Sequence, residues 1–201
     1  MPSPLKKIMP LIVLLFTCLL VRGQEIGLQL YSLRHELAKD VPATLEKIKA
    51  LGIKNIEMGD TYGLPFYEFI KLLAKNELTV VSFGADFDKL EKNPQQVADE
   101  ARMYGAKYVV CSWIPHQDSF KIHDVERASR VFNQAAQIMA LNGLLFCYHP
   151  HGYEFDAYAD GTLFDQFMNV LDNRYVYLEM DVFWIKQAGC DPIALLKKYP
   201  T

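Results

Sequence analysis

The sequence predicts an α/β barrel built from parallel βα units, because short apolar strands alternate with amphipathic helices along the chain. Six runs have the length and composition of strands: residues 26–31, 53–58, 78–83, 107–113, 143–149 and 175–181. Their starts recur every 25 to 36 residues, so successive strands should be parallel and buried on both faces. The turn that begins at Tyr31 lacks the glycine-rich phosphate loop of a doubly wound sheet, which favours a barrel.

The predicted helices have recognisable ends. Asp40 is a candidate N-cap, Pro42 falls in the first turn, and Gly52 follows the last turn of the first helix. Asp191 and Pro192 begin the last helix with an N-cap and a proline at the first helical position. These signals place the helices in the intervals between the strands.

Length and composition are those of one globular domain. The chain has 201 residues, of which 51% are hydrophobic and 22% charged, and this excludes disordered and collagen-like classes. A barrel of this kind needs eight βα units, and about six are visible before the chain stops. We therefore expect residues 24–201 to form an incomplete barrel domain, truncated at its C-terminal end.

Residues 1–23 have the pattern of a secretory signal peptide. Lys6 and Lys7 precede the apolar run 8–20, which is too short to span a bilayer. The expected location is the periplasm or the medium, and the mature chain should have no membrane span. Cys18 offers an alternative, lipid anchoring, because residues 15–18 loosely resemble a lipobox.

Charge and cysteine content exclude two further classes. Removing the leader leaves 18 basic and 24 acidic residues, a net charge of −6, which is unfavourable for binding nucleic acid. Cys111, Cys147 and Cys190 remain, at spacings that match no zinc or redox motif. Buried thiols are expected rather than a disulfide framework.

Polar residues gather where the predicted strands end, which is where parallel α/β folds bind ligands. His149 and His151 stand two apart at a strand end, so their imidazoles can point to one side, and Asp181 ends the next strand. This set suits a divalent ion, although histidines satisfied by the loop have the same spacing. Gln29 and Tyr31 end the first strand.

Further candidates have two interpretations each. Glu57 interrupts an apolar strand, where a carboxylate is costly unless it is paired or meets water or a metal. It is either part of an ion pair or a catalytic group. Glu154 follows the histidine pair, and Trp184 is either a rim aromatic or the wall of a sugar site. The other histidines, His35, His116 and His123, are expected at the surface.

Four motifs carry a resemblance to a known family. They are IGLQLYSLR at 26–34, GIKNIE at 52–57, YHPHGYEF at 148–155 and MDVFW at 180–184. Together they resemble the sugar phosphate isomerase/epimerase proteins of the xylose isomerase-like TIM barrel superfamily, over residues 25–201. The resemblance is specific for the superfamily and not for a substrate.

The resemblance implies one divalent ion, most often manganese with magnesium, cobalt or zinc as alternatives, and proton transfer next to a carbonyl. Asp181 matches the strand-six aspartate ligand, and His149 falls where many epimerases place a glutamate that is both ligand and acid/base. Glu154 matches a glutamate that contacts substrate. The histidine of strand seven and the glutamate of strand eight have no counterpart in these 201 residues.

The same superfamily contains endonucleases of abasic-site repair, which place a histidine ligand three residues after the strand-six aspartate. Trp184 occupies that position here. With the acidic net charge, this makes nucleic acid an unexpected partner.

The resulting hypothesis is an exported, metal-dependent sugar or keto-sugar isomerase or epimerase that acts through a metal-stabilised enediolate. A lyase or hydratase on a keto-sugar or keto-glycoside is the second enzymatic reading, and a non-catalytic sugar-binding barrel is the third. The assigned roles are metal ligation by His149 and Asp181, catalysis by Glu57 and Glu154, and substrate binding by Gln29, Tyr31, His151 and Trp184. His151 is alternatively a third ligand, and homo-oligomerisation stays open.

Overall fold

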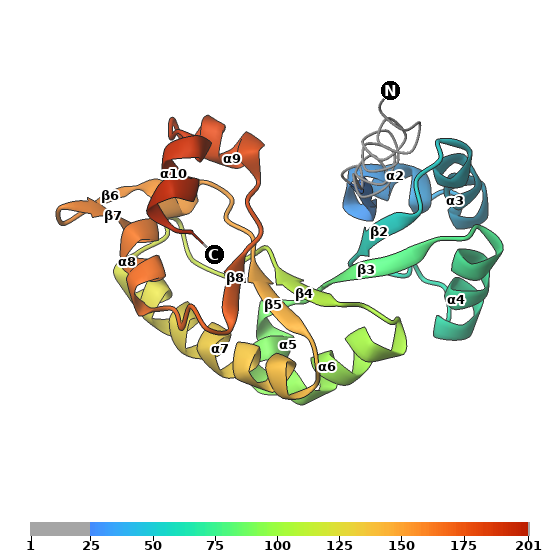
Figure 1. Ribbon diagram of the computed structural model, residues 1–201, viewed down its shortest axis with the longest axis horizontal. Helices are drawn as coiled ribbons and strands as arrows, with labels where there is room; N and C mark the ends of the chain where they lie inside the picture. Colours follow the sequence, from blue (N-terminus) through green and yellow to red (C-terminus); the bar gives the residue numbers. More distant parts are fainter. Residues whose placement is uncertain (1–24, 201) are drawn as a thin grey trace, which may run out of the picture.

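The computed structural model describes residues 25–200, which form one curved sheet of six parallel strands with helices between them (Figure 1). The strand order is β1-β2-β3-β4-β5-β8. The strands are β1 Gly27–Gln29, β2 Asn55–Met58, β3 Thr79–Gly84, β4 Tyr108–Cys111, β5 Leu145–Tyr148 and β8 Val176–Leu178. The short strands β6 Ala157–Tyr158 and β7 Gly161–Thr162 form a separate antiparallel hairpin. This order of parallel neighbours confirms the predicted α/β barrel class.

The signal peptide predicted at 1–23 and Cys18 lie outside the described residues, as does Thr201. Within residues 25–200, no helix has the length and apolar character needed to cross a membrane. In that same part of the chain, β1 and β8 are the two edges of the sheet, each with one neighbouring strand.

The longer helices lie along the outer, convex side of the sheet (Figure 1). The longer ones are α3 Val41–Ala50, α4 Phe66–Lys75, α6 Pro94–Met103, α7 Ile122–Leu141 and α8 Leu163–Val170. The shorter ones are η1 Leu30–Leu33, α2 Arg34–Leu37, α5 Phe87–Lys92, η2 Tyr153–Phe155, α9 Val182–Gln187 and α10 Pro192–Lys198. The predicted caps are confirmed, since Asp40 accepts from Ala43 N at 2.9 Å and Asp191 from Ile193 N at 3.0 Å.

The core fills the layer between the sheet and these helices. Phe132 on α7 is fully buried, and its ring centre lies 5.8 Å from Phe87, 5.1 Å from Phe146 and 5.6 Å from Phe167. Aromatic side chains from α5, α7, α8 and β5 therefore hold the helices against the strands.

Four of the predicted strands end one to three residues later than β1, β4, β5 and β8 do in the structure, and the first and last of them bear on the site. The first ends at Gln29, where η1 begins, rather than at 31, and the last ends at Leu178 rather than at 181. The chain turns at these points because Arg34 donates to Tyr31 O at 3.0 Å and Asp181 caps α9. Tyr31 consequently lies in η1 and Asp181 at the start of α9, both beyond the ends of their strands.

The three cysteines of the described residues form no disulfide. Cys111 and Cys147 are buried and Cys190 is half-buried. Burial raises the pKa of the Cys111 thiol to about 12, which makes it unreactive at neutral pH.

Candidate active site

A cleft of about 620 Å³ lies at the carboxyl ends of the strands. Eight residues were assigned site roles from the sequence. Seven of them line this cleft: Gln29, Tyr31, Glu57, His149, His151, Asp181 and Trp184. The six parallel strands bring their carboxyl ends to one edge of the sheet, so residues far apart in sequence meet there.

His149 stands at the centre of the polar groups. It follows β5 directly, its backbone N–H donates to Cys111 O at 3.1 Å, and its side chain is buried. The ring Nδ1 lies 3.0 Å from Glu179 Oε2, and the ring Nε2 lies 3.5 Å from Asp181 Oδ2. Burial lowers the pKa of His149, but the facing carboxylates of Glu179, Asp181 and Glu57 outweigh it and raise the pKa above its usual value.

Asp181 is fixed by the helix that follows it. Its Oδ1 accepts from Phe183 N at 2.8 Å and from Trp184 N at 3.2 Å, as the N-cap of α9. The other oxygen, Oδ2, is the one that faces His149 Nε2. One carboxylate therefore both caps a helix and presents a free oxygen to the cleft.

The His149–Asp181 pair fits a divalent cation as two of its ligands. His149 Nε2 is buried and has no hydrogen-bond partner among the described residues. When Nδ1 donates to Glu179, an imidazole lone pair and a carboxylate oxygen face each other, and a proton or a metal ion between them removes the repulsion. Within residues 25–200, no three His, Cys, Asp or Glu side chains are arranged to hold a metal. The described residues thus bring two candidate ligands, His149 and Asp181, together in the cleft.

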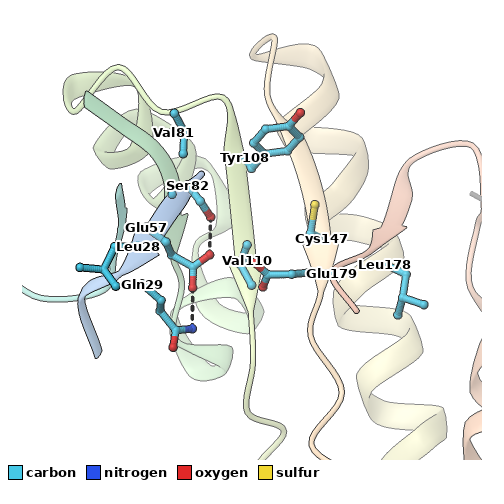
Figure 2. A pocket seen from close by; sticks show the side chains of 11 residues that line it. Leu28, Gln29, Glu57, Val81, Ser82, Tyr108, Val110, Cys147, Leu178 and Glu179 are labelled. Carbon is cyan, nitrogen blue, oxygen red and sulfur yellow. Dashed lines mark hydrogen bonds between the residues drawn. The ribbon is translucent and has the colours of Figure 1, made fainter. Parts of the chain in front are cut away.

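Glu57 faces the same region from β2. Gln29 Nε2 donates to its Oε1 at 2.8 Å, and Ser82 Oγ donates to its Oε2 at 2.8 Å. Figure 2 shows this triplet, with Glu179 extending toward it from the opposite side of a second cavity of about 410 Å³. Burial, followed by the nearby charge of Glu179, raises the pKa of Glu57 to about 7. A carboxyl group that titrates near neutral pH is suited to acid/base work.

The sequence-based site assignment missed Glu179. This side chain contacts His149 directly and lies near Glu57. The sequence did contain a signal for this residue, because Glu179 is a second carboxylate two residues before Asp181. Alternate residues at a strand end point to the same side.

Aromatic rings form one wall of the cleft. The His151 ring centre lies 5.4 Å from Trp184 and 6.1 Å from Trp113, and Trp113 is 52% exposed. An exposed tryptophan face beside polar groups is suited to packing against the C–H face of a sugar. His116, which was expected at the surface, is half-buried: its ring centre lies 4.5 Å from that of Tyr153, and its Nδ1 lies 2.7 Å from Ile114 O.

Glu154 does not line the cleft. It is fully buried in η2, where Oε2 accepts from Gly152 N at 2.7 Å, Oε1 accepts from His151 N at 3.1 Å, and Tyr148 Oη also donates to it. Burial raises the pKa of Glu154, and these donors oppose that effect. The carboxylate thus organises the loop that carries His151, and it is not among the residues that line the cleft.

Replacing Glu154 by Gln is expected to lower the free energy of unfolding by about 2 kcal/mol, because an amide nitrogen would face backbone N–H donors in a buried place. Urea titration measures this. Glu126→Gln, at an exposed position on α7, is the control and should change stability little. Equal stability of both variants would refute the structural role assigned to Glu154.

No protein-family model matches the chain, and no curated protein matches it either. Solved structures do. A sugar phosphate isomerase/epimerase from Parabacteroides distasonis is 26% identical, with a TM-score of 0.77 over 89% of this chain and 76% of that chain. Another from the same organism is 23% identical, with a TM-score of 0.75 over 90% of this chain and 73% of that chain.

More distant neighbours share the fold alone. They include a xylose isomerase-like TIM barrel protein from Mycobacterium smegmatis in complex with magnesium, 18% identical with a TM-score of 0.54 over 70% of this chain and 56% of that chain. The IOLI protein with a bound zinc atom is 14% identical, with a TM-score of 0.60 over 88% and 69%. The chain thus has the xylose isomerase-like TIM-barrel fold and is similar in structure to sugar phosphate isomerase/epimerase proteins.

Proposed function

We propose that this protein is a metal-dependent isomerase or epimerase that moves a proton on the carbon next to the carbonyl of a sugar or keto-sugar. The observation that carries the proposal is the arrangement of Glu57 and the His149–Asp181 pair along one cleft. The likeness to isomerase/epimerase structures and the metals named with two distant neighbours support it. Export through residues 1–23 is part of the same proposal.

His149 and Asp181 would hold the ion, and manganese, magnesium, cobalt and zinc are all compatible with one nitrogen and one oxygen ligand. A bound divalent ion would polarise the substrate carbonyl and so acidify the neighbouring C–H bond. Glu57 takes the proton from that carbon, and Gln29 and Ser82 hold its two oxygens in place. Trp184 and His151 pack against the sugar ring and exclude water from that side.

The described residues that line the cleft include no cluster of lysine or arginine side chains for a phosphate, which favours an uncharged sugar over a sugar phosphate. The described lining includes the carboxylates of Glu57, Asp86 and Asp181 against the single guanidinium of Arg34. Arg34 is itself engaged, since it stacks 4.5 Å above the Tyr31 ring. The described lining therefore offers a phosphate one guanidinium and no further lysine or arginine.

The test is solvent exchange. The Mn²⁺-loaded protein is incubated in heavy water with D-fructose, D-fructose 6-phosphate and a nitrophenyl keto-glycoside, and the products are followed by NMR. Deuterium next to the carbonyl of an unphosphorylated substrate is the expected result. If none of the three substrates incorporates deuterium, the proposal is contradicted and a sugar-binding barrel is favoured.

A lyase is the second candidate, because His149 stands where the family resemblance expects a second acid/base glutamate. Epimerisation needs proton donors on both faces of the carbon, whereas elimination needs one base and a leaving group. Glu57 could take the proton and return it to the departing oxygen. Release of nitrophenol from the keto-glycoside would identify this reaction.

A further inference from the structure

Glu179 lies beside His149 on the neighbouring strand. Its backbone N–H donates to Tyr148 O at 2.8 Å, which continues the pairing of β5 with β8 past Leu178. The side chain then reaches His149 Nδ1 at 3.0 Å. Main-chain and side-chain contacts thus join the same two strand ends.

The contact determines which imidazole nitrogen carries the proton. Glu179 Oε2 is within hydrogen-bond distance of Nδ1, whereas Nε2 has no hydrogen-bond partner among the described residues. An ionised carboxylate can only accept hydrogen bonds, so Nδ1 must be the donor. In the neutral imidazole the lone pair then belongs to Nε2, which is the nitrogen that faces Asp181.

We propose that Glu179 is a positioning residue that fixes the ring orientation and tautomer of His149, so that Nε2 is held ready for a cation beside Asp181. The inference rests on the metal site of the proposed function and extends it to a residue outside that site. Carboxylates that accept from the second nitrogen of a metal-binding histidine commonly contribute about 10- to 100-fold to metal affinity.

The first measurement needs no metal. Long-range ¹H–¹⁵N NMR at pH 9 is recorded on the metal-free protein, with the His149 signals identified by their loss in His149→Ala. The wild type should show the proton on Nδ1, and Glu179→Leu should shift the population toward the Nε2–H form. A wild-type His149 that carries its proton on Nε2 would overturn the inference.

The second measurement is Mn²⁺ affinity by calorimetry. Glu179→Leu should bind about 10- to 100-fold more weakly, and Glu179→Gln should lose less because its amide oxygen still accepts from Nδ1–H. Glu68→Gln, on the exposed side of α4, is the control. Unchanged affinity in Glu179→Leu would refute the positioning role. Absence of Mn²⁺ binding by the wild type, with the expected tautomer present, would refute the metal site and leave the positioning of His149 supported.

Discussion

Replacing Asp181 by Asn is expected to weaken Mn²⁺ binding by at least about 100-fold, a loss of about 2.7 kcal/mol. Asparagine is as good an N-cap as aspartate, so α9 should keep its first turn while the cleft loses the charged oxygen that faces His149. His149→Ala should have a similar effect, because it removes the only nitrogen ligand of the proposed pair. Calorimetry and the metal content of the purified protein measure both.

The chain offers a matched control for each change. Asp191 caps α10 as Asp181 caps α9, and it accepts from Ile193 N at 3.0 Å, but it does not line the cleft. Asp191→Asn should therefore leave metal binding unchanged. His123, whose side chain is 70% exposed, serves in the same way as a control for His149. Wild-type affinity in Asp181→Asn would disprove the assignment of this carboxylate as a ligand.

Replacing Glu57 by Gln is expected to slow solvent exchange into the substrate by about 100- to 10,000-fold. The amide occupies the same space and keeps the contacts with Gln29 and Ser82, but it cannot take a proton. Because burial and Glu179 raise the pKa of Glu57 to about 7, the wild-type rate should rise with pH through that value as the base becomes ionised. Exchange at the wild-type rate in Glu57→Gln would exclude this group as the base.

The same substitution has an effect on stability that the metal-free protein should show. A pKa raised from 4.5 to about 7 in the folded state means that ionising Glu57 costs free energy, so stability falls as pH rises through this interval. The polar and titratable groups near Glu57 are Gln29, Ser82, Glu179 and His149. None of them supplies a proton in place of the one that Glu57 loses. The free energy of unfolding of Glu57→Gln minus that of the wild type should therefore be larger at pH 8 than at pH 4, by at most about 3 kcal/mol. Urea titrations at both pH values, with Glu68→Gln as control, measure this.

The fold and much of the cleft could be predicted from the sequence because both depend on local periodicity. The spacing of apolar runs and the caps at Asp40 and Asp191 located strands and helices, and parallel strands necessarily bring their carboxyl ends to one edge. Gln29, Glu57 and His149 could therefore be placed in one cleft before any contact was known.

The sequence could not separate Glu154 from Glu57, although both are carboxylates near strand ends. Glu154 turns toward the backbone N–H groups of its own loop, whereas Glu57 faces the cleft. The role of Glu179 was equally hidden, because it depends on a 3.0 Å contact with a histidine 30 residues earlier. A residue's chemistry is set by which donors and charges surround it, and sequence spacing does not report that.

The sequence by itself determined the alternation of strands and helices, the class of fold, and the strand ends at which polar residues gather. The tertiary structure alone decided that Glu154 accepts from backbone N–H groups and that Glu57 lies beside Glu179. It also decided that Nε2 of His149 has no hydrogen-bond partner within residues 25–200. The physical reason is that secondary structure follows from interactions between near neighbours in the chain. Protonation and ligand geometry follow from burial and from charges that only the folded chain brings within a few ångströms.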